Sequence, residues 1–165
     1  MQYIYAAKGL PASGKSTYFS DEKWSDIPYH SADEIRVRLF GEEYEFTRQN
    51  EKVIWTKFGQ EVRESLSAGK SIIIDNTNLT KFAVRNIEKL SEEFEADIIW
   101  YDKTDVPIAE CIRRNRARNK EYPVPDWVIF QMAYHSLPEK LDEEIVGICI
   151  DFPEVVAEFL KNMRR

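Results

Sequence analysis

The sequence predicts an α/β fold with a mostly parallel, five-stranded sheet and helices on both of its faces. Short apolar segments alternate with longer segments of helical periodicity along the whole chain, which is typical of a parallel sheet covered by helices. Residues 72–74 are three consecutive isoleucines, as expected of a strand that is buried on both faces. A glycine-rich loop joins the first predicted strand to the first predicted helix. A chain of 165 residues suits one domain with a sizeable core, so residues 1–165 are expected to form a single domain.

The individual elements follow from the same patterns. The expected strands cover residues 2–8, 27–31, 71–75, 96–102 and 145–151. The expected helices cover residues 15–19 and onward towards 24, 31–40, 47–68, 80–94, 105–119, a segment that begins at Pro125, and residues 153–163. Ser31, with Glu34 three residues later, marks a helix start, and Pro125 suits a first helical position. Ligands of parallel sheets bind beyond the carboxyl ends of the strands. We therefore expect one crevice at the residues that follow four strands: Gly9 onward, 31–33, 75–77 and Asp102 onward.

Residues 9–17, Gly-Leu-Pro-Ala-Ser-Gly-Lys-Ser-Thr, match the phosphate-binding loop pattern G-x-x-x-x-G-K-[ST] at every fixed position. Glycines let the backbone turn tightly, so that successive N–H groups point at a polyphosphate, and the helix that follows adds partial positive charge. We expect Lys15 to reach the β- and γ-phosphates of ATP and Ser16 to ligate Mg²⁺. The expected nucleotide contacts in this loop are Gly9, Pro11, Ala12, Ser13, Gly14, Lys15, Ser16 and Thr17.

Two carboxylates at strand ends are candidates for catalysis. Asp33 begins a helix, where it could accept the proton of an acceptor hydroxyl during phosphoryl transfer, although a favourable helix dipole explains an acid there equally well. Arg36 lies three residues later on the same helical face and could hold a phosphate of the acceptor, although an isolated arginine is more simply a solvated charge. Asp75 ends an apolar strand, where nucleotide-dependent enzymes place an acid associated with Mg²⁺. A strand-ending turn explains Asp75 as well.

Four arginines lie within six residues, at positions 113, 114, 116 and 118. Arg114 and Arg118 are spaced i, i+4 and therefore share a helical face. A short polar loop that contains proline, residues 120–124, follows them. Arginines in such a place can close over ATP and stabilise charge on the transferring group, although a solvated basic helix has the same pattern. The sequence thus indicates a lid at about residues 113–125.

Composition limits the partners. The net charge of −6 would repel nucleic acid overall, so such a partner would need a local basic patch. No apolar run approaches the roughly 20 residues of a membrane span, and no signal peptide is evident. These observations predict a cytoplasmic protein without a membrane partner. Cys111 and Cys149 have no CxxC spacing and are expected to be buried, reduced thiols.

The ordered set of motifs resembles the kinase module of phage-type polynucleotide 5′-hydroxyl kinases, within the wider group of P-loop kinases, over residues 3–137. The features that carry the resemblance are the loop of residues 9–17 with its internal proline, Asp33-Glu34-Ile35-Arg36, Thr77-Asn78-Leu79 after an isoleucine strand, Arg114-Asn115 with Arg118, and Val124-Pro125 at a helix start. The resemblance implies a three-layer P-loop kinase fold with a small lid. It also implies ATP as phosphoryl donor with Mg²⁺, and a nucleic acid with a 5′-hydroxyl end as acceptor.

The resemblance also implies roles for single residues. Asp33 would be the general base on the 5′-hydroxyl, and Arg36 would contact the 3′-phosphate of the acceptor. Arg118 would be the lid arginine on the ATP phosphates. The implied catalytic residues are thus Asp33, Lys15 and Arg118. Arg114 and Arg118 join the nucleotide contacts; the implied acceptor contacts are Arg36, Asp33 and Thr77, and the metal contacts are Ser16 and Asp75.

The chain departs from this family in two ways. The acid of the family stands directly before the threonine, where this chain has Asn76, so that the acid is displaced to Asp75. Bifunctional members continue into a phosphatase with a D-x-D-G-T motif. This sequence has no such motif and ends at Arg165, so we expect a kinase only.

Two other classes of function remain open. A related kinase could phosphorylate a different hydroxyl, such as a hydroxymethylated pyrimidine in phage DNA or a small metabolite, and the acidic net charge favours that alternative. Outside enzymes, the chain could be an ATP-dependent binding module or switch without transfer activity. Asp33 and the arginines argue against the binding module, because neither a base nor a lid is needed for binding alone.

Overall fold

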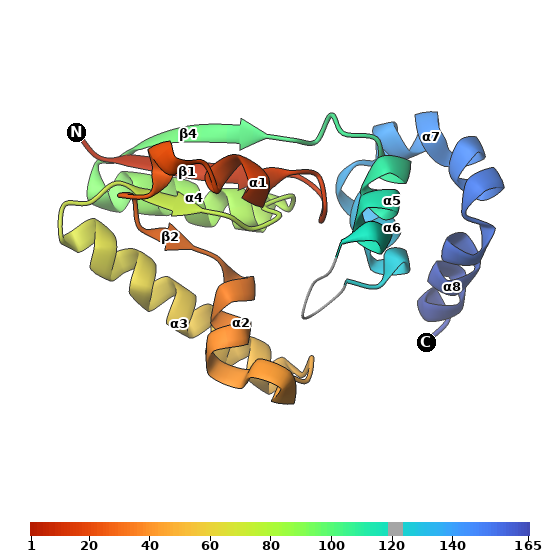
Figure 1. Cartoon of the computed structure of the whole chain (residues 1–165), viewed down its shortest axis with the longest axis horizontal. Coiled ribbons are helices and arrows are strands. Elements are labelled where there is room, and N and C mark those ends of the chain that lie inside the picture. The colour runs from red at the N-terminus through yellow and green to blue at the C-terminus, as the bar shows by residue number, and fades with distance from the viewer. Residues whose placement is uncertain (119–123) are drawn as a thin grey trace. The chain divides into compact units, whose positions relative to one another are not determined.

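The computed structural model describes residues 1–118 and 124–165, and Figure 1 labels its helices and strands. It divides into two compact units. The first consists of Met1–Lys8 and Lys15–Tyr101, and the second of Gly9–Gly14 and Asp102–Arg165. A single kinase domain over residues 1–165 stays a prediction. Of the expected lid, residues 119–123 lie outside the described part of the chain.

The first unit is built on a sheet that has four strands within the described residues, in the order β2-β3-β1-β4. The strands are β1 (Tyr3–Lys8), β2 (Tyr29–His30), β3 (Ile72–Ile74) and β4 (Asp97–Asp102). Both β1 and β2 run parallel to β3, with Ile4 opposite Ile72 and Tyr29 opposite Ile73. Parallel neighbours that are not consecutive in the chain need crossover connections, which here contain the helices. The predicted parallel α/β fold is confirmed.

The helices of this unit are α1 (Lys15–Phe19), α2 (Ala32–Phe40), α3 (Arg48–Ser67) and α4 (Lys81–Phe94), with short 3₁₀ turns at Glu22–Trp24 and Gly41–Glu43. Hydroxyl side chains begin three of them. Ser31 accepts a hydrogen bond from the Asp33 backbone N–H at 3.2 Å, and Thr47 and Thr80 accept from backbone N–H groups three residues later, both at 3.1 Å. Such caps satisfy N–H groups that the helix leaves unpaired. They explain why the predicted helix starts agree closely with the observed ones.

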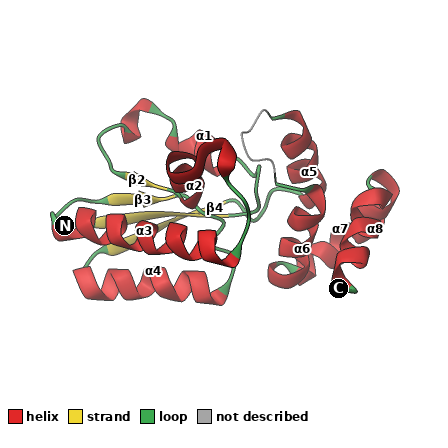
Figure 2. Ribbon diagram, turned by 90° about the horizontal axis from the view of Figure 1, so that it is seen from below, coloured by secondary structure: helices red, strands yellow, loops and turns green. Residues whose placement is uncertain are grey.

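Helices cover both faces of the sheet, as Figure 2 shows for α1 on one side and α3 and α4 on the other. Successive residues of a strand point to opposite faces. Ile4 and Ala6 of β1 accordingly pack in a core cluster with Val62 of α3 and Leu90 of α4. On the other face, Ala7 packs with Phe19 of α1 and Ile73, beside a group of half-buried aromatic side chains: Tyr5, Tyr18, Trp24, Tyr29 and Tyr101.

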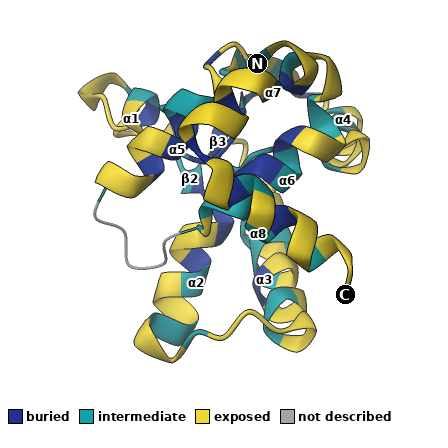
Figure 3. Cartoon of the chain, turned by 90° about the vertical axis from the view of Figure 1, so that its right-hand side faces the viewer, coloured by how far each residue is buried: buried dark blue, intermediate teal, exposed yellow. Residues whose placement is uncertain are grey.

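The second unit contains the glycine-rich loop and, within its described residues, four helices. These helices are α5 (Ile108–Ala117), α6 (Asp126–Ser136), α7 (Pro138–Asp151) and α8 (Pro153–Met163). Prolines open α7 and α8, where the missing N–H would have no helical partner. Phe130 of α6 and Phe159 of α8 are buried, with ring centroids 4.9 Å apart. In Figure 3, α8 alternates buried and exposed residues, as an amphipathic helix does when it packs along one side.

The predicted strand over residues 145–151 is wrong, because these residues form the second half of α7. Leu141 and Ile148, seven residues apart, are buried, whereas Val146 and Ile150 are 70% and 73% exposed. Burial at a spacing of seven is helical, since two helical turns bring a side chain back to the same face. The β-branched composition suggested a strand, but such composition is a weak and context-dependent signal. The described sheet therefore has four strands rather than five.

The two cysteines differ in their surroundings. Cys111 on α5 is buried, as predicted, but Cys149 on α7 is exposed, which corrects the prediction for that residue. Cys149 follows the buried Ile148 and is turned away from it by about 100°, the angle between successive helical residues. Across the described residues, the helices are too short or too polar to cross a membrane.

Candidate functional site

The glycine-rich loop in the second unit is a tight turn. The Ser13 backbone N–H donates to the Leu10 carbonyl oxygen at 3.2 Å, and Ala12 has a φ of 62°. A Cβ atom at Gly9, which has a φ of 155°, would lie 2.7 Å from Ser13 Oγ. Gly14 has a φ of 99°, a conformation that side chains strongly disfavour. Both glycines are therefore required by the turn itself, which has the compact backbone that a phosphate cradle needs.

Arg114 lies beside this loop within the second unit. A Cβ atom built on Gly14 would be 3.9 Å from Nη1 of Arg114, and the Arg114 Nε donates to Glu110 Oε1 at 2.9 Å. The structure thus brings together the loop and one of the two arginines that the sequence assigns to the nucleotide. A guanidinium next to Gly14 suits an anion held by the loop.

Arg118 and Arg116 have different surroundings. Arg118 Nη2 donates to Oδ1 of the buried Asn115 at 3.0 Å. Arg116 instead bonds Asp126 Oδ2 at 2.6 Å and Glu154 Oε1 at 2.7 Å. Arg116 therefore ties α5 to α6 and α8. Arg118 follows the last residue of α5 with an extended backbone, so it does not continue the helical face of Arg114, and Asn115 of α5 holds its guanidinium.

Lys15 and Ser16 begin α1 in the first unit. Lys15 is buried, whereas Ser16 and Thr17 are exposed. The Tyr29 hydroxyl donates to Oδ2 of the buried Asp75 at 2.5 Å and also shares a hydrogen bond with the Ser16 side chain. Burial and then the negative charge of Asp75 raise the pKa of Tyr29, so its hydroxyl stays protonated and can donate.

The two residues that the sequence assigns to a metal, Ser16 and Asp75, thus meet at one tyrosine hydroxyl. Their donor atoms are a hydroxyl oxygen and a carboxylate. Oxygen ligands of this kind, with room for water and phosphate, are what Mg²⁺ takes in nucleotide sites. The chemistry of these donors therefore fits the ion.

The ends of β2 and β3 lie side by side in the first unit. His30 pairs with Ile74, and the Asn76 Oδ1 accepts a hydrogen bond from the Ala32 backbone N–H at 3.0 Å. Asn76 therefore supports the start of α2 by accepting the hydrogen bond of one of its first backbone N–H groups. Thr77 is half-buried in the segment that follows. Because Gly9 and Asp102 belong to the second unit, the common crevice of all four strand ends stays a prediction.

Asp33 and Arg36 lie on one face of α2, as their spacing predicts. Arg36 Nη1 is 2.7 Å from Asp33 Oδ1, and the Asp33 side chain is 52% exposed. The carboxylate is thus accessible to a second molecule while one of its oxygens is held by the guanidinium. Such an arrangement fixes the carboxylate and leaves it able to accept a proton.

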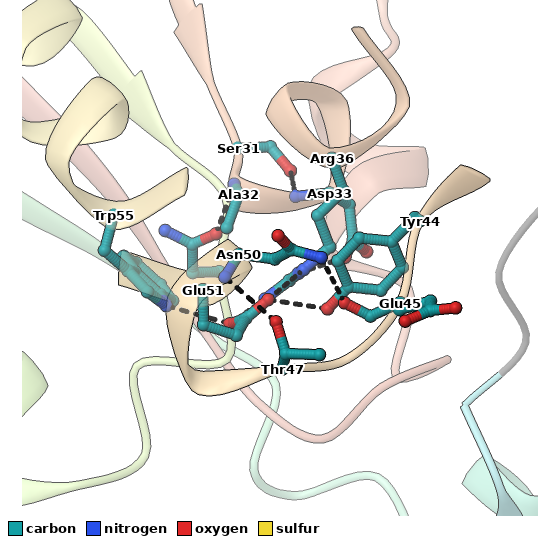
Figure 4. Close-up of polar contacts among 11 residues, drawn as sticks. Ser31, Ala32, Asp33, Arg36, Tyr44, Glu45, Thr47, Asn50, Glu51 and Trp55 are labelled. Carbon is teal, nitrogen blue, oxygen red and sulfur yellow. Dashed lines mark hydrogen bonds and ion pairs between the residues drawn. The ribbon is translucent and has the colours of Figure 1, made fainter. Parts of the chain in front are cut away.

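Glu51 on α3 completes this cluster and was not anticipated from the sequence (Figure 4). Arg36 binds it with two parallel bonds, from Nε at 2.9 Å and from Nη2 at 2.7 Å. The Tyr44 hydroxyl donates to Glu51 at 2.7 Å and the Trp55 Nε1 donates at 3.1 Å. Residues 36 and 51 come together only because α2 packs on α3, so no local spacing in the sequence could have predicted this contact.

The protonation of this cluster follows from its contacts. Burial alone would raise the pKa of Glu51, but hydrogen bonds from Arg36 and Tyr44 outweigh burial and hold the pKa below its ordinary value of 4.5. Burial likewise acts to lower the pKa of Arg36, and the bonds to Glu51 raise it instead. Both groups are therefore charged at neutral pH.

We expect Glu51→Gln to lower the free energy of unfolding at neutral pH by about 2 kcal/mol, the typical scale of hydrogen bonds to a charged group. Because the pKa of Glu51 is depressed in the folded state, its contribution is complete above the ordinary value of 4.5 and declines as the pH falls through the folded pKa. Denaturant unfolding of both proteins at several pH values measures the difference between them. A difference that stays constant into acid would contradict the assignment to this ion pair.

Comparison with solved structures relates the fold to known proteins. A chain in the structure of the Pnkp1/Rnl/Hen1 RNA repair complex is 22% identical with a TM-score of 0.70, over 86% of this chain and 46% of that chain. A chain in the structure of AvrRxo1-ORF1 and ORF2 with ATP is 14% identical with a TM-score of 0.60, over 88% of this chain and 51% of that chain. This chain thus spans about half the length of these solved chains, and such identities show the fold alone.

A comparison with curated proteins gives no match. The model of the AAA_33 family, described as an AAA domain, matches residues 5–135. That stretch includes the phosphate-binding loop, the Asp33 cluster and α5, and it makes up more than half of the chain. The chain therefore belongs to the AAA_33 family of AAA domains, as a P-loop kinase-like domain.

Proposed function

We propose that this domain transfers the γ-phosphate of ATP to the 5′-hydroxyl of a polynucleotide. The observation that carries the proposal is the cluster at the start of α2, where Asp33 is accessible and is held by Arg36 at 2.7 Å. Such a carboxylate is suited to accept a hydroxyl proton, which binding of a nucleotide alone would not need. The likeness of fold to a chain from an RNA repair complex supports a nucleic acid as acceptor.

The donor side of the proposal uses the phosphate-binding loop. Backbone N–H groups of residues 9–14 and the Lys15 ammonium would bind the β- and γ-phosphates. Ser16 and Asp75 would hold Mg²⁺, which when bound neutralises charge on the phosphates. The Tyr29 hydroxyl keeps the Asp75 carboxylate oriented through its hydrogen bond of 2.5 Å.

On the acceptor side, Asp33 takes the proton as the acceptor oxygen forms its bond to the γ-phosphorus. The bond between that phosphorus and the bridging oxygen breaks, and ADP leaves. Arg36 and Thr77 would contact the acceptor, with Arg36 near its 3′-phosphate. Arg114 and Arg118 would stabilise the negative charge on the transferring group.

Arg118 is expected to be the arginine with the larger effect on turnover. Arg118→Ala should lower kcat by roughly a hundredfold, a typical loss for one charge contact in the transition state. Arg116→Ala removes exposed ion pairs to Asp126 and Glu154 and should change kcat by about twofold at most. Steady-state kinetics of the two variants test this difference. Equal losses would indicate a diffuse basic patch that merely attracts a polyanion.

A second acceptor class is favoured by one observation. Two carboxylates, Asp33 and Glu51, already neutralise Arg36, so a phosphate of the acceptor would have to compete with them. A hydroxyl without a neighbouring phosphate, as in a hydroxymethylated pyrimidine or a small metabolite, would not compete. A net charge of −6 points in the same direction.

The proposal is tested with ATP labelled in the γ-phosphate and a panel of acceptors: 5′-hydroxyl DNA and RNA oligonucleotides, nucleosides with and without a 3′-phosphate, and DNA containing hydroxymethyluracil. Label on the oligonucleotides at the 5′ end is the expected result. Label on the modified base or on nucleosides alone would support the second acceptor class. Binding of ATP without transfer to any acceptor would instead indicate a binding module.

A further inference from the structure

We infer that Glu51 is a positioning residue for the proposed base, acting on Asp33 through Arg36. This inference rests on the proposed function, since it assigns a purpose to the geometry around Asp33. Glu51 lies on α3, outside the segment that carries Asp33 and Arg36, and the Arg36 guanidinium bonds both its carboxylate and that of Asp33.

The first step is the saturation of the Glu51 carboxylate by four donors. Its Oε1 accepts from Arg36 Nε and from the Tyr44 hydroxyl, and its Oε2 accepts from Arg36 Nη2 and from the Trp55 Nε1. The distances lie between 2.7 and 3.1 Å. A carboxylate held at both oxygens by three different side chains has one orientation available to it.

The second step is the transfer of this order to Arg36. Two parallel bonds to one carboxylate fix the plane of a guanidinium as well as its position. The Arg36 and Glu51 side chains are each only 16% exposed, so water competes little for these bonds. The third guanidinium nitrogen of Arg36, Nη1, donates to Asp33 Oδ1 at 2.7 Å.

The third step concerns Asp33 itself. Its side chain is 52% exposed, and an ion pair to a freely moving arginine at such a surface contributes little order. When Glu51 holds the Arg36 guanidinium in place, the same ion pair defines where the Asp33 carboxylate lies. A general base must be within hydrogen-bond reach of the acceptor hydroxyl, so an error of about 1 Å in its position can cost about a hundredfold in rate.

A second ion pair between α2 and α3 does not involve Asp33 and can serve as a control. Arg38 and Glu61 also join α2 to α3, with Nη2 and Oε1 2.6 Å apart, but Arg38 is 52% exposed. Both pairs contribute an ion pair between the same helices, and only one of them leads to Asp33. Glu61→Gln is therefore the control for any general effect of weakening the contact between α2 and α3.

The experiment measures kcat and KM for transfer from ATP to a 5′-hydroxyl DNA oligonucleotide, with the full chain and its variants. We expect Glu51→Gln to lower kcat by about tenfold or more, because the base is displaced. Glu61→Gln should leave kcat within about twofold. The KM for ATP should stay the same in both, since neither residue belongs to the donor side. Equal losses in the two variants, or a normal kcat in Glu51→Gln, would overturn the inference.

A double-substitution cycle tests whether Glu51 and Arg36 act through the same pair of hydrogen bonds. Arg36→Lys keeps the positive charge but not the two parallel bonds, so it should lower kcat as Glu51→Gln does. If the two substitutions act through the same two hydrogen bonds, the double variant should be no slower than the slower single variant. If they act independently, the two changes in activation free energy should add. An additive double variant would therefore argue against the path through Arg36.

A readout independent of turnover follows the Arg36 Nε–H by nuclear magnetic resonance. A bond to a largely buried carboxylate should slow the exchange of this proton with water. The slow exchange should persist in Asp33→Asn and in Glu61→Gln and be lost in Glu51→Gln. Persistence in Glu51→Gln would overturn the inference. If Asp33→Asn abolishes transfer and Glu51→Gln does not, only the inference fails, whereas full turnover by Asp33→Asn, or no transfer by the unmodified chain, overturns the proposed function as well.

Discussion

Lys15→Ala is expected to abolish phosphoryl transfer while the chain remains folded. Lys15 is the first residue of α1 and directly follows the loop of residues 9–14, and in the proposed function its ammonium contacts the transferred phosphate. Losing such a charge contact in the transition state should lower kcat by roughly a thousandfold. Alanine favours a helix, so the backbone of α1 should persist. Transfer assays with labelled ATP, together with circular dichroism, measure the two effects separately.

Lys23→Ala provides the matched control. Lys23 is also a lysine of the first unit, and its ammonium lies over the rings of Tyr18 and Trp24, 4.8 and 5.4 Å from their centroids. Removing it takes away one positive charge without touching the phosphate-binding loop, and kcat should stay within about twofold. Similar losses from both lysines, or unfolding of Lys15→Ala, would remove the support for a direct role of Lys15.

Asp33→Asn is expected to abolish most transfer to a hydroxyl with little change in the affinity for ATP. Asparagine keeps the size of the side chain, and its backbone N–H can still donate to the Ser31 hydroxyl that caps α2. Asparagine cannot take a proton, and general base catalysis typically raises the rate by about a hundredfold to ten-thousandfold. Turnover and the binding of a non-hydrolysable ATP analogue measure the two quantities.

Glu34→Gln is the control for this second prediction. Glu34 is the next residue of the same helical turn, so the substitution removes the same charge from the start of α2. Transfer should persist in Glu34→Gln and be lost in Asp33→Asn. Turnover near that of the unmodified chain in Asp33→Asn would rule out the proposed base. Equal losses in the two variants would indicate an effect of the charge at the helix start rather than of proton transfer.

Features that depend on neighbouring residues could be predicted from the sequence. The caps at Ser31, Thr47 and Thr80 bond backbone N–H groups no more than three residues away. The burial of β3 could be predicted because its three residues are all isoleucine. The turn at Gly9 is partly local, because a Cβ atom there would lie 2.7 Å from Ser13 Oγ, but it would also lie 3.2 Å from the Cβ of Lys103, which is distant in the sequence. Such features define the α/β pattern and the phosphate-binding loop.

Features that depend on packing could not be predicted in this way. Residues 145–151 have a composition that suits either a strand or a helix, and the spacing of buried Leu141 and Ile148 became decisive only in the folded unit. Glu51 is fifteen residues from its partner Arg36, on another helix. Asn76 accepts a hydrogen bond from the Ala32 backbone, 44 residues away in the sequence, so this role could not be recognised from local spacing.

The central claim, transfer to a 5′-hydroxyl, is tested most directly with two oligonucleotides that differ only at that end. One carries a 5′-hydroxyl and the other a 5′-phosphate, and each is incubated with the full chain, Mg²⁺ and ATP labelled in the γ-phosphate. The account predicts label on the first oligonucleotide alone, and none on either when Lys15→Ala replaces the unmodified chain. Equal label on both oligonucleotides, or label on neither, would contradict it.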